Sequence, residues 1–458
     1  MNIVDIIIKK RNKEELTEEE INYFIKEYCK DNIKDYQASS LLMACFLNKL
    51  TTNETYYLTK AIVESGEILD TSKINGFTVD KHSTGGVGDK TSLVLVPLLA
   101  SLDVKVLKMS GKGLGHTGGT IDKLNSIPGF KTELKKNDFI KQVNDIGCCL
   151  VSQSKEIALA DKKLYALRDV TGTIDNESLI AASIMSKKIA LNTDIICLDV
   201  KVGNGAFFKT LKSAISATKL MIKIGEMFDK KVCAVISSMD QPLGNAIGNS
   251  LEVNEAIETL KGNGPKDLEE TCIELAYQIL KNTQKYDISV LRKLIKDNLY
   301  NGKAYNKFIK LINAQGGKLP ITGNKNIIKT NLISNNEGYI NYIDTYELGK
   351  ILVDLGGGRK YKEQEINYDV GLTIKVKIND YINKNDILFE VYSKDPLSQE
   401  LKNRILNTIK LSNRKRHNLK NIYKIIWECK KLCVKLSNYD KRLVTSQSFS
   451  LIYVTIES

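Results

Sequence analysis

The chain of 458 residues lacks any apolar run close to the roughly 18 residues that a transmembrane helix needs, so we expect no membrane span. Its first segment, Met1-Asn-Ile-Val-Asp-Ile-Ile-Ile8, is too short for the apolar region of a signal peptide and carries the charged Asp5. No pair among the nine cysteines has the spacing of a metal site, and their odd number predicts buried, reduced thiols. Together these features favour a cytoplasmic protein.

The chain also has little histidine and tryptophan, with three residues and one residue respectively, while its formal net charge is +13. A basic surface is typical of nucleic-acid binding, but the lysines here are spread along the whole chain. The one dense basic run, residues 413–420, has no interleaved aromatic side chains. We therefore expect a solvated basic face and no nucleic-acid partner.

Two glycine-rich loops contain two of the three histidines. The first reads Asp80-Lys-His-Ser-Thr-Gly-Gly-Val-Gly-Asp-Lys-Thr-Ser92, and the second reads Lys108-Met-Ser-Gly-Lys-Gly-Leu-Gly-His-Thr-Gly-Gly-Thr-Ile-Asp122. Glycine N–H groups can approach an anion closely, lysine adds a positive charge, and serine and threonine add neutral donors. Each loop follows a strand-like run. The pair is typical of a site for a small dianion such as phosphate.

The residue pattern changes along the chain and predicts three units. Residues 1–70 predict helices, because apolar side chains recur at helical spacing. Residues 71–330 mainly alternate strand-like and helical stretches, which predicts an α/β fold with a mainly parallel central sheet covered by helices. Residues 331–426 contain runs that alternate apolar and polar positions, which predicts a small C-terminal α+β unit.

The first loop leads from a strand into a helix that starts near Thr91. Ser92 therefore lies at a helix N-terminus, where free N–H groups and the helix dipole favour an anion. Lys81, His82 and Ser83 end the preceding strand. Ligands of open α/β sheets bind at the carboxyl ends of strands, so we expect these three residues to point to the same crevice. Structural turns alone would explain the glycines but not these neighbours.

Two nucleotide-binding motifs are incomplete. In Gly88-Asp-Lys-Thr91 an aspartate separates the glycine from the lysine, unlike in a Walker A motif. Gly113-Leu-Gly-His-Thr-Gly118 has the glycine spacing of dinucleotide-binding loops, but it does not open the first strand–helix–strand unit. Both matches are therefore weak predictions of a nucleotide ligand.

A third group of polar residues lies on a predicted helical stretch. Ser183 and Lys187 are four residues apart and share a helix face, and Arg168 precedes them. A hydroxyl, an ammonium and a guanidinium can bind the carbonyl and N–H edges of a heterocycle. Taken alone, these residues also fit an ordinary solvated helix face.

Together the three stretches resemble the thymidine and pyrimidine-nucleoside phosphorylases. The segment 110–125 is similar to the family's Ser-Gly-Arg-Gly-Leu-Gly-His-Thr-Gly-Gly-Thr-Ile-Asp-Lys-Leu-Glu, with Lys112 and Asn125 in place of the arginine and the last glutamate. The resemblance covers about residues 1–425. It implies reversible phosphorolysis of pyrimidine nucleosides to the free base and (2-deoxy)ribose 1-phosphate, with phosphate as co-substrate and no organic cofactor.

The resemblance also implies roles for individual residues. The phosphate would contact Lys81, His82, Ser83, Ser92, Lys108, Met109, Ser110 and Thr120, and the pyrimidine would contact Tyr165, Arg168, Ser183 and Lys187. His82, Arg168 and Lys187 would act in catalysis, because the leaving base gains negative charge. His82 would donate a proton or a hydrogen bond to the pyrimidine 2-carbonyl, and removal of a general acid costs about 10²–10⁴ in rate.

Members of this family combine a small helical domain, here residues 1–70 with 160–192, with a larger α/β domain, and they form homodimers. Some bind a monovalent cation, usually potassium, and the matching positions are Gly88, Lys90, Leu243, Ala246 and Glu255. Lys90 stands where some relatives have threonine. Because an ammonium repels a cation, we expect only the backbone carbonyl of Lys90 to contribute to this potassium site.

Other interpretations remain open. The fold also resembles anthranilate phosphoribosyltransferase, but that class needs magnesium and an acidic pair that the sequence does not clearly supply. A non-catalytic phosphate-binding module would use both loops but would not need Arg168, Ser183 and Lys187. The sequence does not separate a thymidine-specific enzyme from one that also accepts uridine, and the resemblance favours the broader choice. Residues 427–458 match nothing in the family, and we expect a tail without a catalytic role.

Overall fold

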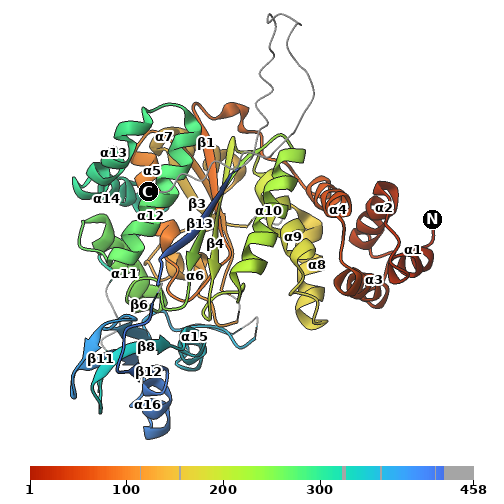
Figure 1. The fold of residues 1–458 in the computed structure, drawn as a ribbon. Helices are drawn as coiled ribbons and strands as arrows, with labels where there is room; N and C mark the ends of the chain where they lie inside the picture. Colours follow the sequence, from red (N-terminus) through yellow and green to blue (C-terminus); the bar gives the residue numbers. More distant parts are fainter. Residues whose placement is uncertain (114, 154–155, 322–325, 362–363, 418, 428–458) are drawn as a thin grey trace, which may run out of the picture. The chain divides into compact units, whose positions relative to one another are not determined.

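A mainly parallel sheet forms the centre of the larger domain (Figure 1). The computed structural model describes residues 1–113, 115–153, 156–321, 326–361, 364–417 and 419–427. Within these residues the strands lie in the order β13-β5-β4-β1-β2-β3, and all neighbours are parallel except β13, which pairs antiparallel with β5. The strands are β1 (Thr78–Ser83), β2 (Lys105–Ser110), β3 (Cys148–Ser152), β4 (Ile195–Val202), β5 (Lys231–Ser238) and β13 (Ile422–Trp427).

Helices cover both faces of this sheet, because successive strand residues point to opposite sides. Val106 belongs to a core shared with α5 and α11 to α14, whereas Leu107 belongs to a core shared with α7, α9 and α10. None of the helices in the described ranges has the length and apolarity of a membrane span. The helices of this domain are α5 (Thr91–Ser101), α6 (Thr120–Asn125), α7 (Lys136–Ile146), α10 (Leu211–Met227), α11 (Asn249–Leu260), α12 (Lys266–Thr283), α13 (Ile288–Tyr300) and α14 (Lys303–Ala314).

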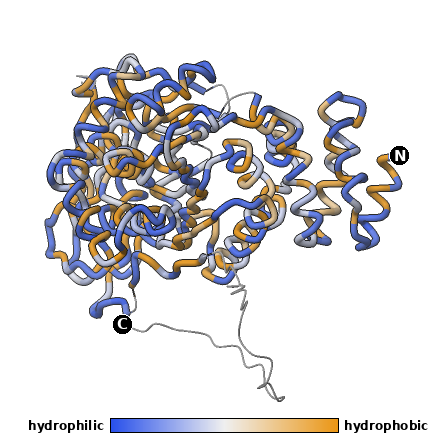
Figure 2. The backbone as a smooth tube through the Cα atoms, turned by 90° about the horizontal axis from the view of Figure 1, so that it is seen from above, coloured by the Kyte–Doolittle hydropathy of each residue, from blue (hydrophilic) through white to orange (hydrophobic). Residues whose placement is uncertain are grey.

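The helical domain joins two distant segments of the chain. Its first helices start at strong N-caps: Thr17 and Glu20 form a capping box, as do Thr51 and Glu54. Helix α4 packs on α9, so residues near 60 and near 185 share one core. Figure 2 shows hydrophobic and hydrophilic residues alternating along these helices. They are α1 (Ile3–Arg11), α2 (Glu18–Cys29), α3 (Asp35–Asn48), α4 (Thr52–Glu64), α8 (Leu159–Val170) and α9 (Glu177–Ala190), and a short 3₁₀ turn (Thr71–Lys73) follows α4.

The C-terminal unit consists of two small antiparallel sheets with two helices. One sheet has the strand order β10-β8-β12 and the other β6-β9-β11-β7. Strand β6 comes from the segment just before α11, so this unit is joined to the α/β domain by strand pairing as well as by the chain. The elements are β6 (Ala246–Ile247), β7 (Ile328–Ile333), β8 (Gly338–Ile343), α15 (Thr345–Asp354), β9 (Gly371–Ile374), β10 (Tyr381–Ile382), β11 (Ile387–Ser393), α16 (Gln399–Leu406) and β12 (Ile409–Ser412).

The predicted α/β fold with a small helical domain and a C-terminal α+β unit is confirmed, but two strands of the main sheet were not predicted. Cys148 and Cys149, considered above only for their spacing, begin the edge strand β3. Residues 422–427 form β13 and pair with β5, so the expected boundary at residue 426 falls inside a strand of the main sheet. The expected tail therefore begins after Trp427, and residues 428–458 lie outside the described residues.

Candidate active site

The first glycine-rich loop starts at the carboxyl end of β1 and ends in the first turn of α5. The buried ammonium of Lys81 lies 2.8 Å from Asp199 Oδ2 and donates to Thr91 Oγ1 at 2.5 Å. Burial alone would lower the pKa of Lys81, but the carboxylates of Asp199 and Asp89 outweigh it and raise that pKa. The hydroxyl of Ser83 is hydrogen-bonded to Asp89. Lys81 is thus held as a cation at this edge of the sheet.

The second loop starts at the carboxyl end of the neighbouring strand β2. Lys108 and Ser110 are two residues apart and therefore lie on the same face of the strand. The Lys108 ammonium donates to Met109 O at 2.9 Å, and within the described chain it forms no ion pair. Burial, and next the charge of Lys188, hold the pKa of Lys108 well below its usual value. The buried Ser110 hydroxyl has no hydrogen-bond partner in the described part of the chain. Both groups are available to an anion.

The rest of the second loop is anchored by residues that the sequence did not single out. Asp122 accepts from the Gly113 N–H at 2.6 Å and pairs with Arg359 of the C-terminal unit at 2.8 Å. The ring of His116 packs on Tyr346 with a centroid distance of 4.5 Å. Thr120, predicted from the resemblance to contact phosphate, is half-buried and lies at the N-terminus of α6. The C-terminal unit therefore supports this loop.

The predicted pyrimidine-binding side chains lie on α8 and α9. Lys187 Nζ donates to Ser183 Oγ at 3.0 Å and lies 2.5 Å from Asp161 Oδ2. Asp161 is buried and was not predicted, because its role depends on the packing of α8 against α9. Its carboxylate orients the ammonium of Lys187. Ser183 and Lys187 thus place one hydroxyl and one cation together on the helix face that their spacing predicted.

Arg168 was predicted to contact the pyrimidine, but most of its donors bind the protein backbone. Its guanidinium donates to three backbone carbonyls: Nε to Thr173 at 3.2 Å, Nη1 to Leu179 at 3.1 Å and Nη2 to Ile174 at 2.9 Å. A guanidinium has five N–H donors, so most of this group holds the segment between α8 and α9. Tyr165, one turn earlier, is half-buried, and burial raises the pKa of its phenol.

His82 lies close to both the residues predicted to bind phosphate and the residues predicted to bind the pyrimidine. Burial, followed by the charges of Lys188, Lys108, Lys187 and Lys81, holds its pKa well below the usual value. The imidazole is therefore neutral at pH 7. Lys188, which the sequence did not single out, pairs with the buried Asp80 at 2.7 Å and donates to Met109 O at 3.4 Å. The surroundings of His82 are strongly electropositive.

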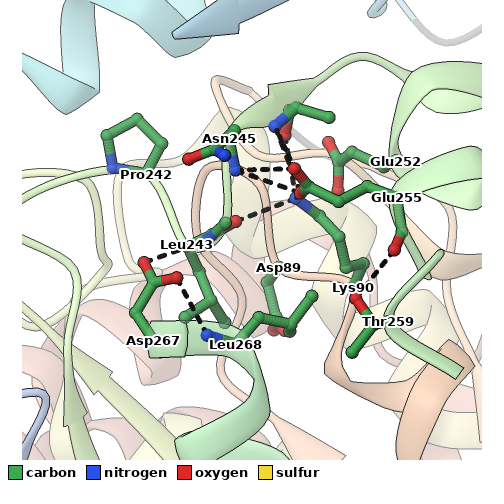
Figure 3. A network of polar contacts seen from close by, with 12 residues as sticks. Asp89, Lys90, Pro242, Leu243, Asn245, Glu252, Glu255, Thr259, Asp267 and Leu268 are labelled. Carbon is green, nitrogen blue, oxygen red and sulfur yellow. Dashed lines mark hydrogen bonds and ion pairs between the residues drawn. The ribbon is translucent and has the colours of Figure 1, made fainter. Parts of the chain in front are cut away.

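One expectation about the predicted potassium site is corrected by the structure: Lys90 contributes its side chain and not only its backbone. The residues of the site do meet, but around the side chain of Lys90, whose ammonium contacts Leu243 O, Ala246 O and Glu255 Oε2 (Figure 3). A second cation on the same oxygens would lie within about 4 Å of the ammonium, where two unit charges repel by about 4 kcal/mol at an effective dielectric constant of about 20. These residues therefore do not fit a bound potassium ion.

Comparison with known proteins agrees with this arrangement. Family models match a "Glycosyl transferase family, helical bundle domain" over residues 4–66, a "Glycosyl transferase family, a/b domain" over 75–305 and a "Pyrimidine nucleoside phosphorylase C-terminal domain" over 339–412. Pyrimidine-nucleoside phosphorylases of Bacillus subtilis and Staphylococcus epidermidis are 47% and 45% identical to the chain over 90% of its length, covering 96% and 97% of their own. The chain belongs to the pyrimidine-nucleoside phosphorylase family.

A further relative and one solved structure extend this result. The pyrimidine-nucleoside phosphorylase of Geobacillus stearothermophilus is 46% identical over 90% of the chain and 96% of its own length. The crystal structure of anthranilate phosphoribosyltransferase from Thermus thermophilus aligns with a TM-score of 0.56 over 68% of this chain and 99% of that one. At 16% identity this likeness shows a shared fold alone. The family's fold is thus that of the expected phosphoribosyltransferase type.

Proposed function

We propose that this chain catalyses the reversible phosphorolysis of pyrimidine nucleosides, including thymidine, uridine and deoxyuridine. The products are the free base and α-D-ribose 1-phosphate or its 2-deoxy form. One observation carries the proposal: on one face of β2, the buried amino group of Lys108 forms no ion pair and the buried Ser110 hydroxyl has no hydrogen-bond partner among the described residues. Such groups are costly to leave unmatched, and a phosphate dianion offers acceptors to both.

The phosphate site proposed here joins the ends of β1 and β2 to two helix N-termini. Its residues are Lys81, His82, Ser83, Ser92, Lys108, Met109, Ser110 and Thr120. The charge of Lys81 attracts the dianion, the amino group of Lys108 adds N–H donors, and the first turns of α5 and α6 add further N–H donors. Each charge-assisted hydrogen bond contributes roughly 1.5–3 kcal/mol. Bound in this way, the phosphate is positioned to attack the anomeric carbon of the sugar.

The pyrimidine site proposed here uses Tyr165, Arg168, Ser183 and Lys187. When the N-glycosidic bond breaks, the sugar gains positive charge and the base gains negative charge. Lys187, oriented by Asp161, stabilises the departing base electrostatically. Neutral His82 donates an N–H hydrogen bond to the base rather than carrying a full positive charge of its own. The phosphate approaches as the electron pair of the broken bond moves to the base nitrogen.

We also propose a cytoplasmic homodimer. Helices α1 and α3 pack together and expose five large hydrophobic side chains, with exposed fractions between 36% and 71%: Val4, Ile8, Tyr36, Met43 and Leu47. A surface of this kind favours contact with a second protein surface. In a homodimer the same patch can meet its own copy across a twofold axis.

The proposed activity is tested by incubating the purified protein with thymidine or uridine, with and without phosphate, and following release of the base by absorbance. Phosphate-dependent release from both nucleosides is expected. Release from thymidine alone would identify a thymidine-specific enzyme, and no release from either would contradict the proposal. Ser110→Ala removes one phosphate donor, so it should raise KM for phosphate about tenfold. KM for the nucleoside in the same variant is the internal control and should change less than about twofold.

A further inference from the structure

The Lys90 side chain ends in a complete coordination shell of its own (Figure 3). Its fully buried ammonium donates to Leu243 O at 2.8 Å, to Ala246 O at 2.9 Å and to Glu255 Oε2 at 2.5 Å. A lysine ammonium has three N–H donors, and here each has an acceptor. Two carbonyls and a carboxylate are also the kind of oxygen ligands that bind a monovalent cation.

The atoms around the ammonium are fixed by the backbone. The Glu255 carboxylate also accepts from the N–H groups of Asn245 and Ala246 at 2.9–3.1 Å. Gly244 adopts φ +68°, and a Cβ there would lie 2.3 Å from Glu255 Oε2 and 3.0 Å from Lys90 Nζ. The chain is therefore wrapped closely around the charge.

The charge itself is retained. Burial alone would lower the pKa of Lys90, but the carboxylates of Glu255 and Glu252 outweigh that effect and raise the pKa. The side chain therefore stays cationic at neutral pH. Its interactions balance one buried positive charge against the carboxylate of Glu255.

We infer that Lys90 is a built-in cation that takes the place of a bound monovalent metal ion and makes this protein independent of potassium. The inference goes beyond the proposed function, because it concerns how the site is held together. A covalently attached ammonium does not dissociate, so its contacts do not depend on the salt in solution.

The position of Lys90 explains what such a cation would do. Lys90 directly precedes α5, whose first turn carries Ser92 of the proposed phosphate site. Its contacts connect this turn to the segment 243–246 and to Glu255 on α11. Lys90 is thus a positioning residue: it fixes the end of the first glycine-rich loop without touching the substrate.

The first measurement compares thermal unfolding and phosphorolysis of the unmodified protein in potassium chloride and in tetramethylammonium chloride at equal ionic strength. We expect Tm to agree within about 1 °C and kcat/KM within about twofold, because the ammonium of Lys90 already occupies the oxygens of this site. A Tm or a rate that rises specifically with potassium would overturn the inference. The Tm comparison needs no enzymatic activity, so it remains informative if the proposed function fails.

The variant Lys90→Thr removes the ammonium and leaves the two carbonyls and the carboxylate of Glu255. This variant should acquire a response to potassium: its Tm should rise by about 5 °C or more in potassium chloride over tetramethylammonium chloride. Any activity should rise about tenfold or more with the same change of salt. An equal Tm in both salts would contradict the idea that Lys90 fills a cation site. If this variant does not fold, the comparison of the unmodified protein in the two salts still tests the inference.

A matched control exists in the helical domain. Lys10 and Glu54 form a buried pair at 2.7 Å, and the Glu54 carboxylate also accepts from the N–H groups of Leu16 and Thr51. Lys10 Nζ has no carbonyl acceptor within the described ranges. Lys10→Thr should therefore lower Tm by the same amount in both salts, which separates the loss of a buried ion pair from the creation of a cation site.

Discussion

At the scale of single residues, His82 provides a test of the electrostatics of the site. Burial and four neighbouring lysines hold its pKa well below the usual value, so its imidazole should be neutral in the free protein across the neutral range. Proton NMR of the imidazole signals can check this, because the chain has only three histidines. The signal that disappears in His82→Gln should not titrate between pH 5.5 and 8. A midpoint near 6.5 would contradict the electropositive surroundings described above.

The lowered pKa of His82 also has a consequence for stability. Below about pH 6.5 an unfolded chain protonates this histidine while the folded protein does not, so the free energy of unfolding falls as the pH decreases. The slope is at most about 1.4 kcal/mol per pH unit for one proton. Between pH 7.5 and 5.5, Tm of the unmodified protein should therefore fall further than Tm of His82→Gln. Equal decreases would show that His82 takes up its proton in the folded state as well.

Sequence reasoning found most of the residues of the candidate site but not their partners. Lys108 and Ser110 were visible because lysine and serine stand beside glycines after a strand-like run. Asp161 and Lys188 were not visible, since each acts through a partner on another element: Asp161 on Lys187, and Lys188 on Asp80. Lys90 was expected to contribute only its backbone carbonyl to a cation site. Only the folded chain shows that its side chain is long enough to reach the oxygens of that site.

At the scale of elements, the segment between α8 and α9 depends on one side chain. The Arg168 guanidinium binds the carbonyls of Thr173, Ile174 and Leu179, and α9 carries Ser183 and Lys187 of the proposed pyrimidine site. Arg168→Lys keeps the charge but loses the planar fork, so it cannot hold all three carbonyls in this arrangement. We expect KM for the nucleoside to rise about tenfold or more, while KM for phosphate changes less than about twofold.

A nearby lysine on the same helix serves as the control for this prediction. Lys162 is exposed on α8, so Lys162→Ala should leave both KM values unchanged. If Arg168→Lys raised both KM values equally, Arg168 would support the whole site rather than its pyrimidine side. If it changed neither, the three hydrogen bonds would be unimportant for binding. Steady-state kinetics with each substrate varied in turn distinguishes these outcomes.

Elements were predictable where local signals agree with tertiary packing. The helix after Thr17 has a capping box followed by apolar residues at helical spacing, so the start of α2 at Glu18 follows from local signals. The strand-like run before the second loop forms strand β2, but the strand continues to Ser110, since pairing with β3 extends it into polar residues. Strand β13 was missed because its pairing partner, β5, lies almost 200 residues earlier in the chain.

At the scale of the whole molecule, the α/β fold and its helical partner could be predicted, whereas the end of the α/β domain could not. Alternation of strands and helices indicates a parallel sheet, and helical spacing indicates the bundle. The chain leaves the α/β domain, builds the C-terminal unit and then returns to the main sheet as β13. The amino-acid composition does not indicate that the chain returns to an earlier sheet. A boundary drawn from the fading family pattern therefore cuts through a strand.

This return decides where the chain can be shortened. Removing residues 429–458 leaves β13 complete, so we expect turnover within about twofold of the full chain and Tm within about 2 °C. Ending the chain at Asn421 removes β13 and leaves the long strand β5 as an unpaired edge, which should lower Tm by at least about 5 °C and promote aggregation. Trp427 is the only tryptophan and packs near Lys281, so its fluorescence reports on β13 directly in the longer variant. An inactive protein that lacks only 429–458 would show that the tail has a role in the reaction.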